Sequence, residues 1–437
     1  EGAHYTQFIV YDLDSDGRAE IAVKTADGTI DSKGFVIGDS TRDWRNEKGY
    51  ILAGPEYLSV FNGLTGEVIS TVDFIPPRAS SITPTSMELK RIWGDGYGNR
   101  FDRFLAGVAY LDGIHPSLIF SRGYYTRTVI TAWDFKNNKL EKRWIFDTKD
   151  KGIYNYGGQG NHNLTIADVD GDGKDEIVFG AMCVDDDGTG LYSTGLGHGD
   201  ALHVSDLDPS IPGLEVFDIQ ERFDDAGASF RSAATGKIYW KKASVKPGED
   251  GEGPGRGLAL DIDPRYPGFE CWVVGAGITG LFDCKGNKIS EKAPPCNMGI
   301  YWDGDNLREI LDGTFIGKWD YENSKTNKLL NTADYFCLSN NGTKRNPVLL
   351  ADIYGDWREE AIYRTKDNKE LRIFSTTIPT DLKFYTLMND PQYRLSIVWQ
   401  NVGYNQPPHT GFYFGHGMKN PPKPNVEYIP LREINVH

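Results

Sequence analysis

The sequence is poor in the features that mark several common classes of protein. Only five cysteines occur in 437 residues, and their odd number and irregular spacing exclude a disulfide framework or a zinc-ribbon pattern. A bridge among Cys271, Cys284 and Cys296 stays open, although buried free thiols are the favoured interpretation. No apolar run reaches the roughly 18 residues of a membrane span. No signal peptide is present, and the start at Glu1 is expected to be a processed one.

Basic residues and helical patterns are also scarce. There are 47 Lys and Arg against 62 Asp and Glu, which gives a net charge of −15 and makes nucleic acid an unsuitable partner. Helical periodicity is weak, so we expect very little helix. Glycine (50), tyrosine (23) and tryptophan (10) are abundant instead, as is typical of a β-protein with many tight turns. We predict an all-β fold in a single catalytic domain over residues 1–437.

One motif recurs along the chain: two aspartates, a turn, a glutamate and then an apolar strand. The clearest copies are Asp12-Leu-Asp-Ser-Asp-Gly-Arg-Ala-Glu20 and Asp168-Val-Asp-Gly-Asp-Gly-Lys-Asp-Glu176. Looser copies start at Asp206, Asp261, Asp303 and Asp352, with a degenerate one at Asp112. A spacing of about 40 to 50 residues with four short strands per unit predicts the blades of a β-propeller, with a solenoid as the main alternative.

The number of repeats predicts the number of blades. Seven starts are visible, and the segments Leu395–Trp399 and Gly411–Phe414 near the end have strand-like composition. We therefore predict an eight-bladed β-propeller whose last blade is closed by pairing both ends of the chain.

The aspartate turns are predicted to bind Ca²⁺, several ions in all. Aspartates at positions 1, 3 and 5, a backbone carbonyl at position 7 and a closing acid supply the six to eight oxygens that calcium takes. The alternative is a plain Asp-Gly turn with solvated carboxylates. The predicted ligands in the two clear copies are Asp12, Asp14, Asp16, Arg18 and Glu20, and Asp168, Asp170, Asp172, Lys174 and Glu176. Those in the looser copies are Asp206, Asp208, Asp261, Asp263, Asp352, Asp356 and Glu360.

Longer strings of the sequence resemble polysaccharide lyase family 11. They include Ser121-Arg-Gly-Tyr-Tyr-Thr-Arg127, Gly160-Asn-His-Asn163, Gly195-Leu-Gly-His-Gly-Asp-Ala-Leu-His203 and Asn401-Val-Gly-Tyr-Asn-Gln-Pro-Pro-His409. The likeness runs along essentially the whole chain. It implies a rhamnogalacturonan lyase built on an eight-bladed propeller with many calcium ions. Family members also carry an N-terminal β-domain, which these residues lack, so the closing blade is expected to be incomplete.

The resemblance implies a definite reaction. The substrate is rhamnogalacturonan I, and β-elimination breaks its rhamnose-galacturonate backbone and leaves 4,5-unsaturated galacturonate ends. The proton removed, on C5, is alpha to a carboxylate and therefore weakly acidic. A base must stand about 3 Å from it, and positive charge must stabilise the developing negative charge. Endo-cleavage is the expected mode, by a monomer that is secreted or periplasmic.

The same resemblance assigns the catalytic residues. It places Lys344, Arg256 and Tyr404 at the reacting uronate, with Asn341, Gly342 and Thr343 as substrate contacts. His4 and Arg122 are candidates for the cleft wall. Lys344 suits a base if its neighbours lower its pKa, Arg256 suits a carboxylate clamp, and Tyr404 could be the acid or the base, so the base stays open. The alternatives are a solvated Lys344-Arg345 pair, an ion-paired arginine and a packed aromatic.

Two histidines in glycine-flanked turns form a second candidate site. The resemblance implies that His162 and His198 hold a calcium ion near the cleft, and Asp200 could add an oxygen. Histidine is an unusual calcium ligand, because the ion prefers oxygen. The alternative is a pair of core histidines bonded to the backbone.

Two other functions compete with the lyase. A lectin or adhesion propeller could use the same calcium turns without catalysis. A pectin hydrolase would need two carboxylates about the scissile bond. Only the lyase makes an unsaturated product.

Overall fold

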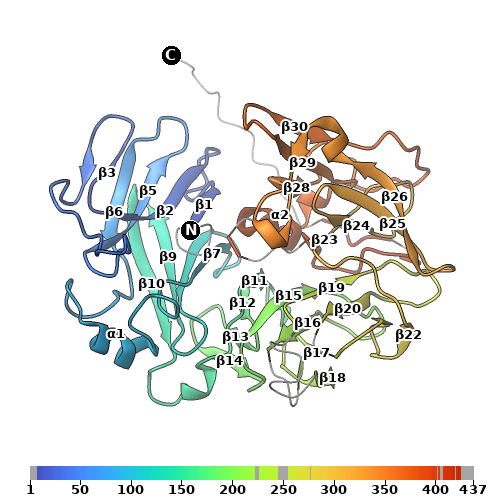
Figure 1. Cartoon of the computed structure of the whole chain (residues 1–437), viewed down its shortest axis with the longest axis horizontal. Coiled ribbons are helices and arrows are strands. Elements are labelled where there is room, and N and C mark those ends of the chain that lie inside the picture. Colours follow the sequence, from blue (N-terminus) through green and yellow to red (C-terminus); the bar gives the residue numbers. More distant parts are fainter. Residues whose placement is uncertain are drawn as a thin grey trace.

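Nearly all strands of the computed structural model lie in seven antiparallel sheets. The structure describes residues 7–221, 226–244, 254–275, 277–400, 402–403, 407–418 and 420–424. The sheets are arranged about a short central helix, α2 (Pro391–Trp399) (Figure 1). A second helix, α1 (Ser86–Trp93), lies at the periphery. The 3-10 turns are η1 (Tyr154–Tyr156), η2 (Thr332–Tyr335), η3 (Gly342–Lys344) and η4 (Leu387–Asn389).

The sheets follow one another along the chain. The first contains β1 (Phe8–Tyr11), β2 (Glu20–Ala26), β5 (Glu56–Asn62) and β6 (Val68–Asp73), and β3 (Thr29–Ile30) pairs with β4 (Val36–Ile37) separately. The second contains β7 (Phe104–Ala109), β8 (Ser117–Arg122), β9 (Val129–Lys136) and β10 (Lys139–Asp147). The third contains β11 (Thr165–Ala167), β12 (Glu176–Phe179), β13 (Met182–Val184) and β14 (Gly190–Ser193). The fourth contains β15 (Gly199–Ser205), β16 (Glu215–Gln220), β17 (Ala228–Ser232) and β18 (Ile238–Lys242).

The last three sheets continue the series. The fifth contains β19 (Arg256–Leu260), β20 (Glu270–Val274), β21 (Leu281–Phe282) and β22 (Lys288–Ser290). The sixth contains β23 (Met298–Ile300), β24 (Glu309–Asp312), β25 (Phe315–Asp320) and β26 (Lys325–Asn331). The seventh has the order β27 (Cys337–Leu338), β29 (Glu360–Thr365), β28 (Leu349–Ala351), and β30 (Leu371–Phe374) pairs with β29.

The sequence repeat corresponds to the sheet. Each aspartate turn joins the innermost long strand of a sheet to the next, and in six of the seven sheets the closing glutamate is the first residue of that next strand. Its Oε2 accepts backbone N–H groups from the turn: Leu13 donates to Glu20 at 2.9 Å and Val169 to Glu176 at 2.8 Å. Buried N–H groups need such partners. The motif therefore stabilises the turn between two strands, independently of any metal ion that it binds.

Neighbouring inner strands run in the same direction. Gln7, just before β1, donates through Nε2 to Phe104 O at the start of β7 (2.5 Å), and Asn161 forms a parallel bridge with Gly199 at the start of β15. The aspartate turns follow these strands, so they lie at one end of the sheets. Residues that precede or begin the strands lie at the other end. His162 and Lys344 precede strands, whereas Asp200 and Arg256 lie at the start of β15 and β19.

The prediction of a strand at Leu395–Trp399 is wrong. These residues belong to α2, which starts with Pro391 at its first turn and is capped by Asp390, whose side chain accepts from Tyr393 N–H at 2.8 Å. The helix is buried on several sides: Trp399 shares an apolar cluster with Phe104 and Ile166. A helix with buried residues on most of its sides has only a weak apolar stripe, so the periodicity by which it could have been recognised is weak too. Gly411–Phe414 is not a strand either.

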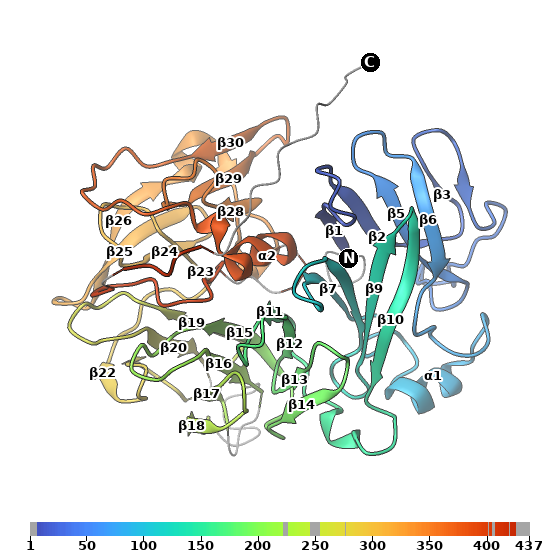
Figure 2. The ribbon, with the colours of Figure 1, turned by 180° about the vertical axis from the view of Figure 1, so that it is seen from behind.

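The ring of sheets is open between the first and the seventh in both views (Figure 2). No strand pairing among the described residues joins these two sheets. The predicted pairing of the chain ends falls on residues 1–6 and 425–437, which lie outside the described part. The all-β class is confirmed, and the count of eight blades stays a prediction.

The two expectations about cysteines and membrane spans agree with the structure. All five cysteines are free and buried, so the bridge among Cys271, Cys284 and Cys296 is not formed. Across the described ranges no helix has the length and apolarity that crossing a membrane would require.

Candidate active site and metal centres

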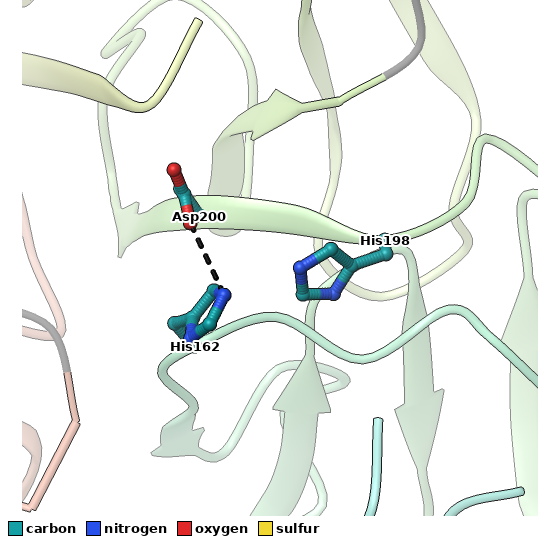
Figure 3. A group of neighbouring side chains, drawn as sticks. All are labelled: His162, His198 and Asp200. Atoms are coloured by element: carbon teal, nitrogen blue, oxygen red, sulfur yellow. Dashed lines mark ion pairs between the residues drawn. The ribbon is translucent and has the colours of Figure 1, made fainter. Parts of the chain in front are cut away.

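His162, His198 and Asp200 lie close together (Figure 3). Their positions before or at the start of inner strands put them at the end of the sheets opposite the aspartate turns. His162 Nε2 lies 3.3 Å from Asp200 Oδ1, and each of the three residues offers one ligand atom within 4.8 Å of the others. The His198 Nδ1 atom lies 2.6 Å from Gly160 O, which leaves Nε2 buried without a hydrogen-bond partner. A buried lone pair beside a carboxylate and a second imidazole fits a cation.

The backbone explains why these side chains converge. Gly197 has φ +89°, which a side chain rarely adopts, and this turn sets the direction of His198. Gly199 admits no side chain, because a Cβ there would lie 2.1 Å from Ile219 O. The close approach allows the Asn161–Gly199 bridge, and that bridge places the loop of His162 beside the strand of Asp200.

Two tyrosines enclose the histidines. Tyr124 OH lies 2.9 Å from His162 Nδ1, and Tyr125 OH lies 3.2 Å from His162 Nε2. Tyr124 also stacks on His198, with ring centroids 5.4 Å apart. Burial lowers the pKa of His198 to about 4, so its ring is neutral at neutral pH and able to bind a metal ion.

Arg100 and Arg103 add positive charge to this enclosure, and the sequence analysis missed both. Their guanidinium carbons lie 5.5 Å and 5.7 Å from the centroid of the Tyr125 ring. Both belong to the loop between α1 and β7, which carries no motif. No local signal in the sequence could have linked them to His198, about a hundred residues away.

Lys344 projects from a loop of constrained geometry. A bridge between Asn340 and Asn346 closes the loop, and Asn341 and Arg345 hold left-handed conformations on either side of η3, with φ 59° and 52°. Such conformations cost free energy and concentrate at functional sites. The conformation brings Lys344 into a half-buried position while Asn341 and Gly342 stay exposed.

The surroundings of Lys344 lower its pKa to about 8. Burial is the main cause, and Arg256 adds to it, while the carboxylates of Asp200 and Glu221 act in the opposite direction. The structure therefore brings Lys344, Arg256 and Asp200 into one electrostatic group. The backbone next to Arg256 also lies close to Asp200: a Cβ on Gly255 would be 2.8 Å from Asp200 Oδ2, so glycine leaves room for that carboxylate. The Arg256 Nε atom is buried without a hydrogen-bond partner.

The other predicted site residues are distributed unevenly. Asn341, Gly342 and the backbone of Thr343 share the Lys344 loop. His4 and Tyr404 lie outside the described residues.

The prediction that Arg122 contacts substrate is wrong. Its side chain is fully buried, with Nη1 donating to Glu56 Oε2 at 2.7 Å and Nη2 to Asp102 Oδ1 at 3.1 Å. Nε donates to Phe101 O at 2.8 Å. Lys24 and Arg78 also pair with Glu56, at 3.0 Å and 3.1 Å. Arg122 is thus part of a buried ion-pair network between the first two sheets.

Replacing Arg122 by alanine is expected to destabilise the fold by about 3–5 kcal/mol, because it leaves buried carboxylates without their partner. Thermal unfolding would measure the loss as a lower Tm. Arg45→Ala, which removes an exposed pair with Asp43, should leave Tm unchanged. Equal Tm values for the two variants would contradict the structural role of Arg122.

A cavity of about 870 Å³ lies beside this network. Lys24, Arg78, Tyr50 and Tyr97 are among its lining residues. Because β7 begins there with Phe104, the cavity opens at the same end of the sheets as the histidine cluster.

The first and third aspartate turns fit a divalent cation. Asp12, Asp14 and Glu20 bring three carboxylate oxygens within 4.8 Å of one another, as do Asp168, Asp170 and Glu176. The Oε1 atom of Glu176 is buried without a partner, and burial raises the pKa of Glu20 to about 7 and of Glu176 to about 8. Carboxylates held this way would be stabilised by a hard cation. Asp16 and Asp172 are not part of these two groups. Like the other aspartates of the turns, they accept a backbone N–H, from Arg18 and Lys174 respectively.

Most of the looser turns correct the prediction. Among the described residues, the fourth, fifth and seventh turns do not gather three ligand atoms. In the fourth turn Lys285 Nζ binds Asp208, the second predicted ligand after Asp206. In the fifth turn Arg265 binds Asp263 through Nε (2.8 Å) and Nη2 (2.6 Å), and Asp261 Oδ2 accepts from Tyr413 OH and His416 N. The Asp352 carboxylate already accepts four donors, those of Gly355 N, Trp357 N, Thr386 Oγ1 and Leu387 N. Asp356 pairs with Arg358, and Glu360 serves the turn backbone. Nearby cations and N–H groups therefore partner Asp208, Asp263, Asp352, Asp356 and Glu360, whereas Asp206 Oδ1 and Asp261 Oδ1 stay buried without a hydrogen-bond partner.

Comparisons with known proteins agree along nearly the whole chain. A family model described as Rhamnogalacturonan lyase family 11, C-terminal domain, matches residues 1–424. Rhamnogalacturonan exolyase YesX of Bacillus subtilis (strain 168) is 58% identical over 438 residues, covering 97% of this chain and 69% of YesX. Rhamnogalacturonan endolyase YesW of the same organism is 56% identical over 431 residues, covering 98% of this chain and 66% of YesW.

Solved structures give the same result. The crystal structure of YesW superposes with a TM-score of 0.90, and that of the Bacillus licheniformis rhamnogalacturonan lyase PL11 with 0.91. Each is 56% identical, and the match covers 98% of this chain and 70% of theirs. The chain spans about two thirds of the length of these relatives.

Proposed function

Since the chain belongs to rhamnogalacturonan lyase family 11, we propose that it cleaves the backbone of rhamnogalacturonan I by β-elimination at the site around Lys344. One observation carries the choice of site: a half-buried lysine whose pKa is lowered to about 8 stands beside Arg256 and Asp200. A neutral amine in that position can accept a proton, and the arginine can bind the carboxylate whose charge grows.

In the proposed reaction, the neutral amine of Lys344 takes the proton from C5 of galacturonate. The electron pair of that C–H bond forms the C4–C5 double bond, and the bond between C4 and its glycosidic oxygen breaks. The leaving oxygen takes a proton from Tyr404 or water and becomes the rhamnose hydroxyl. Arg256 binds the uronate carboxylate throughout and stabilises the charge on its oxygens.

His162, His198 and Asp200 would hold a cation at the same end of the sheets, and such an ion would supply positive charge for the uronate carboxylate when bound. The chain's own contribution is the neutral His198 ring, the Asp200 carboxylate and the enclosing tyrosines. We propose Ca²⁺ for the aspartate turns of the first and third sheets, because those turns offer only oxygen ligands.

We also propose that the seven sheets are blades of an eight-bladed propeller. The support is the single direction of the inner strands and the open arc between the first and seventh sheets. In such a propeller the Lys344 loop and the histidine cluster would lie on one face, around the axis. We further propose that the enzyme is a monomer and that it cleaves internal bonds. It would act outside the cytoplasm, because the polymer substrate is extracellular. The exposure of Asn341 and Gly342 leaves the site accessible to a continuous chain.

The deciding experiment is incubation with purified rhamnogalacturonan I in the presence of calcium. A lyase generates a double bond conjugated to the uronate carboxylate, and ultraviolet absorbance rises with time. Binding without this rise would identify a lectin-like propeller. Chain shortening without it would identify a hydrolase. A rapid fall in viscosity early in the reaction would support internal cleavage, and release of only short products would oppose it.

The rate is expected to depend on pH with the sign of a base that must lose its proton. Because Lys344 must be neutral to act, kcat/KM should rise with pH and level off above a midpoint of about 8. The profile is measured by initial rates in buffers of constant ionic strength and calcium concentration. A flat profile from about pH 6 to about pH 9, on either side of that pKa, would argue against lysine as the base.

A further inference from the structure

The aspartate turn of the sixth sheet already contains a cation, and it is a lysine of the protein. Lys318 Nζ donates to Asp303 Oδ2 at 2.5 Å, to Asp305 Oδ2 at 2.7 Å and to Glu309 Oε1 at 3.1 Å. An ammonium has three N–H donors, so each carboxylate receives one. These three acids are the group that would otherwise offer a metal its ligand atoms.

The closing glutamate of the sixth turn differs from those of the third, fourth and fifth turns in the partner of its Oε1 atom. In the third, fourth and fifth turns the Oε1 atoms of Glu176, Glu215 and Glu270 are buried without a hydrogen-bond partner. In the sixth turn the equivalent atom, Glu309 Oε1, receives Lys318. The Oε2 atom still accepts from the turn, at 2.9 Å from Trp302 N and 3.2 Å from Asp303 N, so the turn itself has the same construction as the others.

Strand register shows that Lys318 is an exception to a rule of the fold. The residue opposite Glu20 on the adjoining strand is Asn62, the one opposite Glu215 is Ser232, and the one opposite Ser117 is Asp134. Extending the printed pairs by one residue gives the other members. The seven residues in chain order are Asn62, Asp134, Asp185, Ser232, Asp283, Lys318 and Ser375. Six of these residues carry an oxygen that could join a cation shell, and among the described sheets only the sixth has an ammonium at this register position.

We propose that the sixth turn is neutralised by Lys318 and takes no divalent cation, whereas the first and third turns depend on one. The ammonium nitrogen lies within 3.1 Å of all three ligand oxygens, so it stands where the ion would be. Calcium needs those oxygens at about 2.3–2.6 Å, and two like charges cannot share the position. The sixth sheet is therefore a metal-independent part of the fold.

The test counts bound calcium in the full chain by equilibrium dialysis and elemental analysis, so it does not depend on catalysis. Lys318→Asn recreates the arrangement of the first turn, where Asn62 faces Glu20. It should bind one more calcium per chain than the wild type, and calcium should raise its Tm by more. The matched control is Lys325→Asn on the neighbouring strand, where the lysine is exposed and lies 3.8 Å from Asp320. It should bind the wild-type number.

A second variant keeps the proposal testable if Lys318→Asn does not fold. Asp305→Asn removes one carboxylate of the same turn while Lys318 stays in place. With the ammonium as the resident cation, the calcium count should not change. Loss of one ion from Asp305→Asn, or a wild-type count in folded Lys318→Asn, would overturn the proposal.

Discussion

Lys344→Ala is expected to lower kcat on rhamnogalacturonan I by about 10²–10⁴-fold, the usual contribution of a general base, with little change in Tm. The loop backbone rather than the lysine side chain holds its shape, through the Asn340–Asn346 bridge and the Gly313 N–H that donates to Arg345 O at 3.0 Å. Removing the amine should therefore abolish proton transfer without unfolding the loop. Initial rates from ultraviolet absorbance, with Tm measured in parallel, check both parts.

Two further variants separate the base from its charge. Lys344→Arg keeps a cation near the uronate, but a guanidinium stays protonated at any usable pH, so activity should remain low. Lys328→Ala removes an exposed lysine that pairs with Asp334 at 3.3 Å on the sixth sheet, and it should leave the rate unchanged. Near-wild-type turnover by Lys344→Ala would remove this lysine from the mechanism and leave Tyr404 as the candidate base.

Removal of divalent metal is expected to lower both Tm and the rate of cleavage. A ligand that binds only the folded chain at about 100 times its Kd adds roughly 2.7 kcal/mol per site, and the first and third turns would each lose that contribution. The histidine cluster would lose positive charge near the substrate at the same time. Calorimetry and initial rates before and after chelation, with calcium added back as the control, measure the two effects.

The metal-free protein should also become less stable as pH rises. Burial raises the pKa of Glu176 from 4.5 to about 8, so the folded chain binds a proton that the unfolded chain releases between these values. Stability should fall over that window and level off above it, and calcium should reduce the dependence. In the chelation experiment, a fall in the rate without a fall in Tm would show that the aspartate turns are not structural metal sites.

The sequence by itself was sufficient to find the repeated aspartate motif and to predict an all-β fold made of successive similar units. Each copy of the motif spans no more than ten residues. The same short turn, closed by a glutamate that accepts its backbone N–H groups, recurs in six of the seven described sheets. Because these interactions are local, reading the residues in order was enough to find seven repeats, one for each main sheet described, and the Asp12 and Asp168 turns as candidate metal sites. The eighth blade was inferred from the composition near the end of the chain and stays a prediction. The candidate histidines and the Lys344 loop were found by resemblance, and their convergence was not visible in any local pattern.

Only the tertiary structure decided which acidic and basic side chains neutralise one another. Glu56 meets Arg122 from 66 residues away and Lys285 reaches Asp208 across 77, so one predicted substrate contact became a buried ion pair and one predicted metal ligand gained an internal cation. Lys318 enters the sixth turn because strand register places it opposite Glu309. The central helix was missed for a related reason, since a helix surrounded by sheets needs no polar face. Burial and partnership depend on neighbours brought together by the fold, and a chain read in order contains no record of those neighbours.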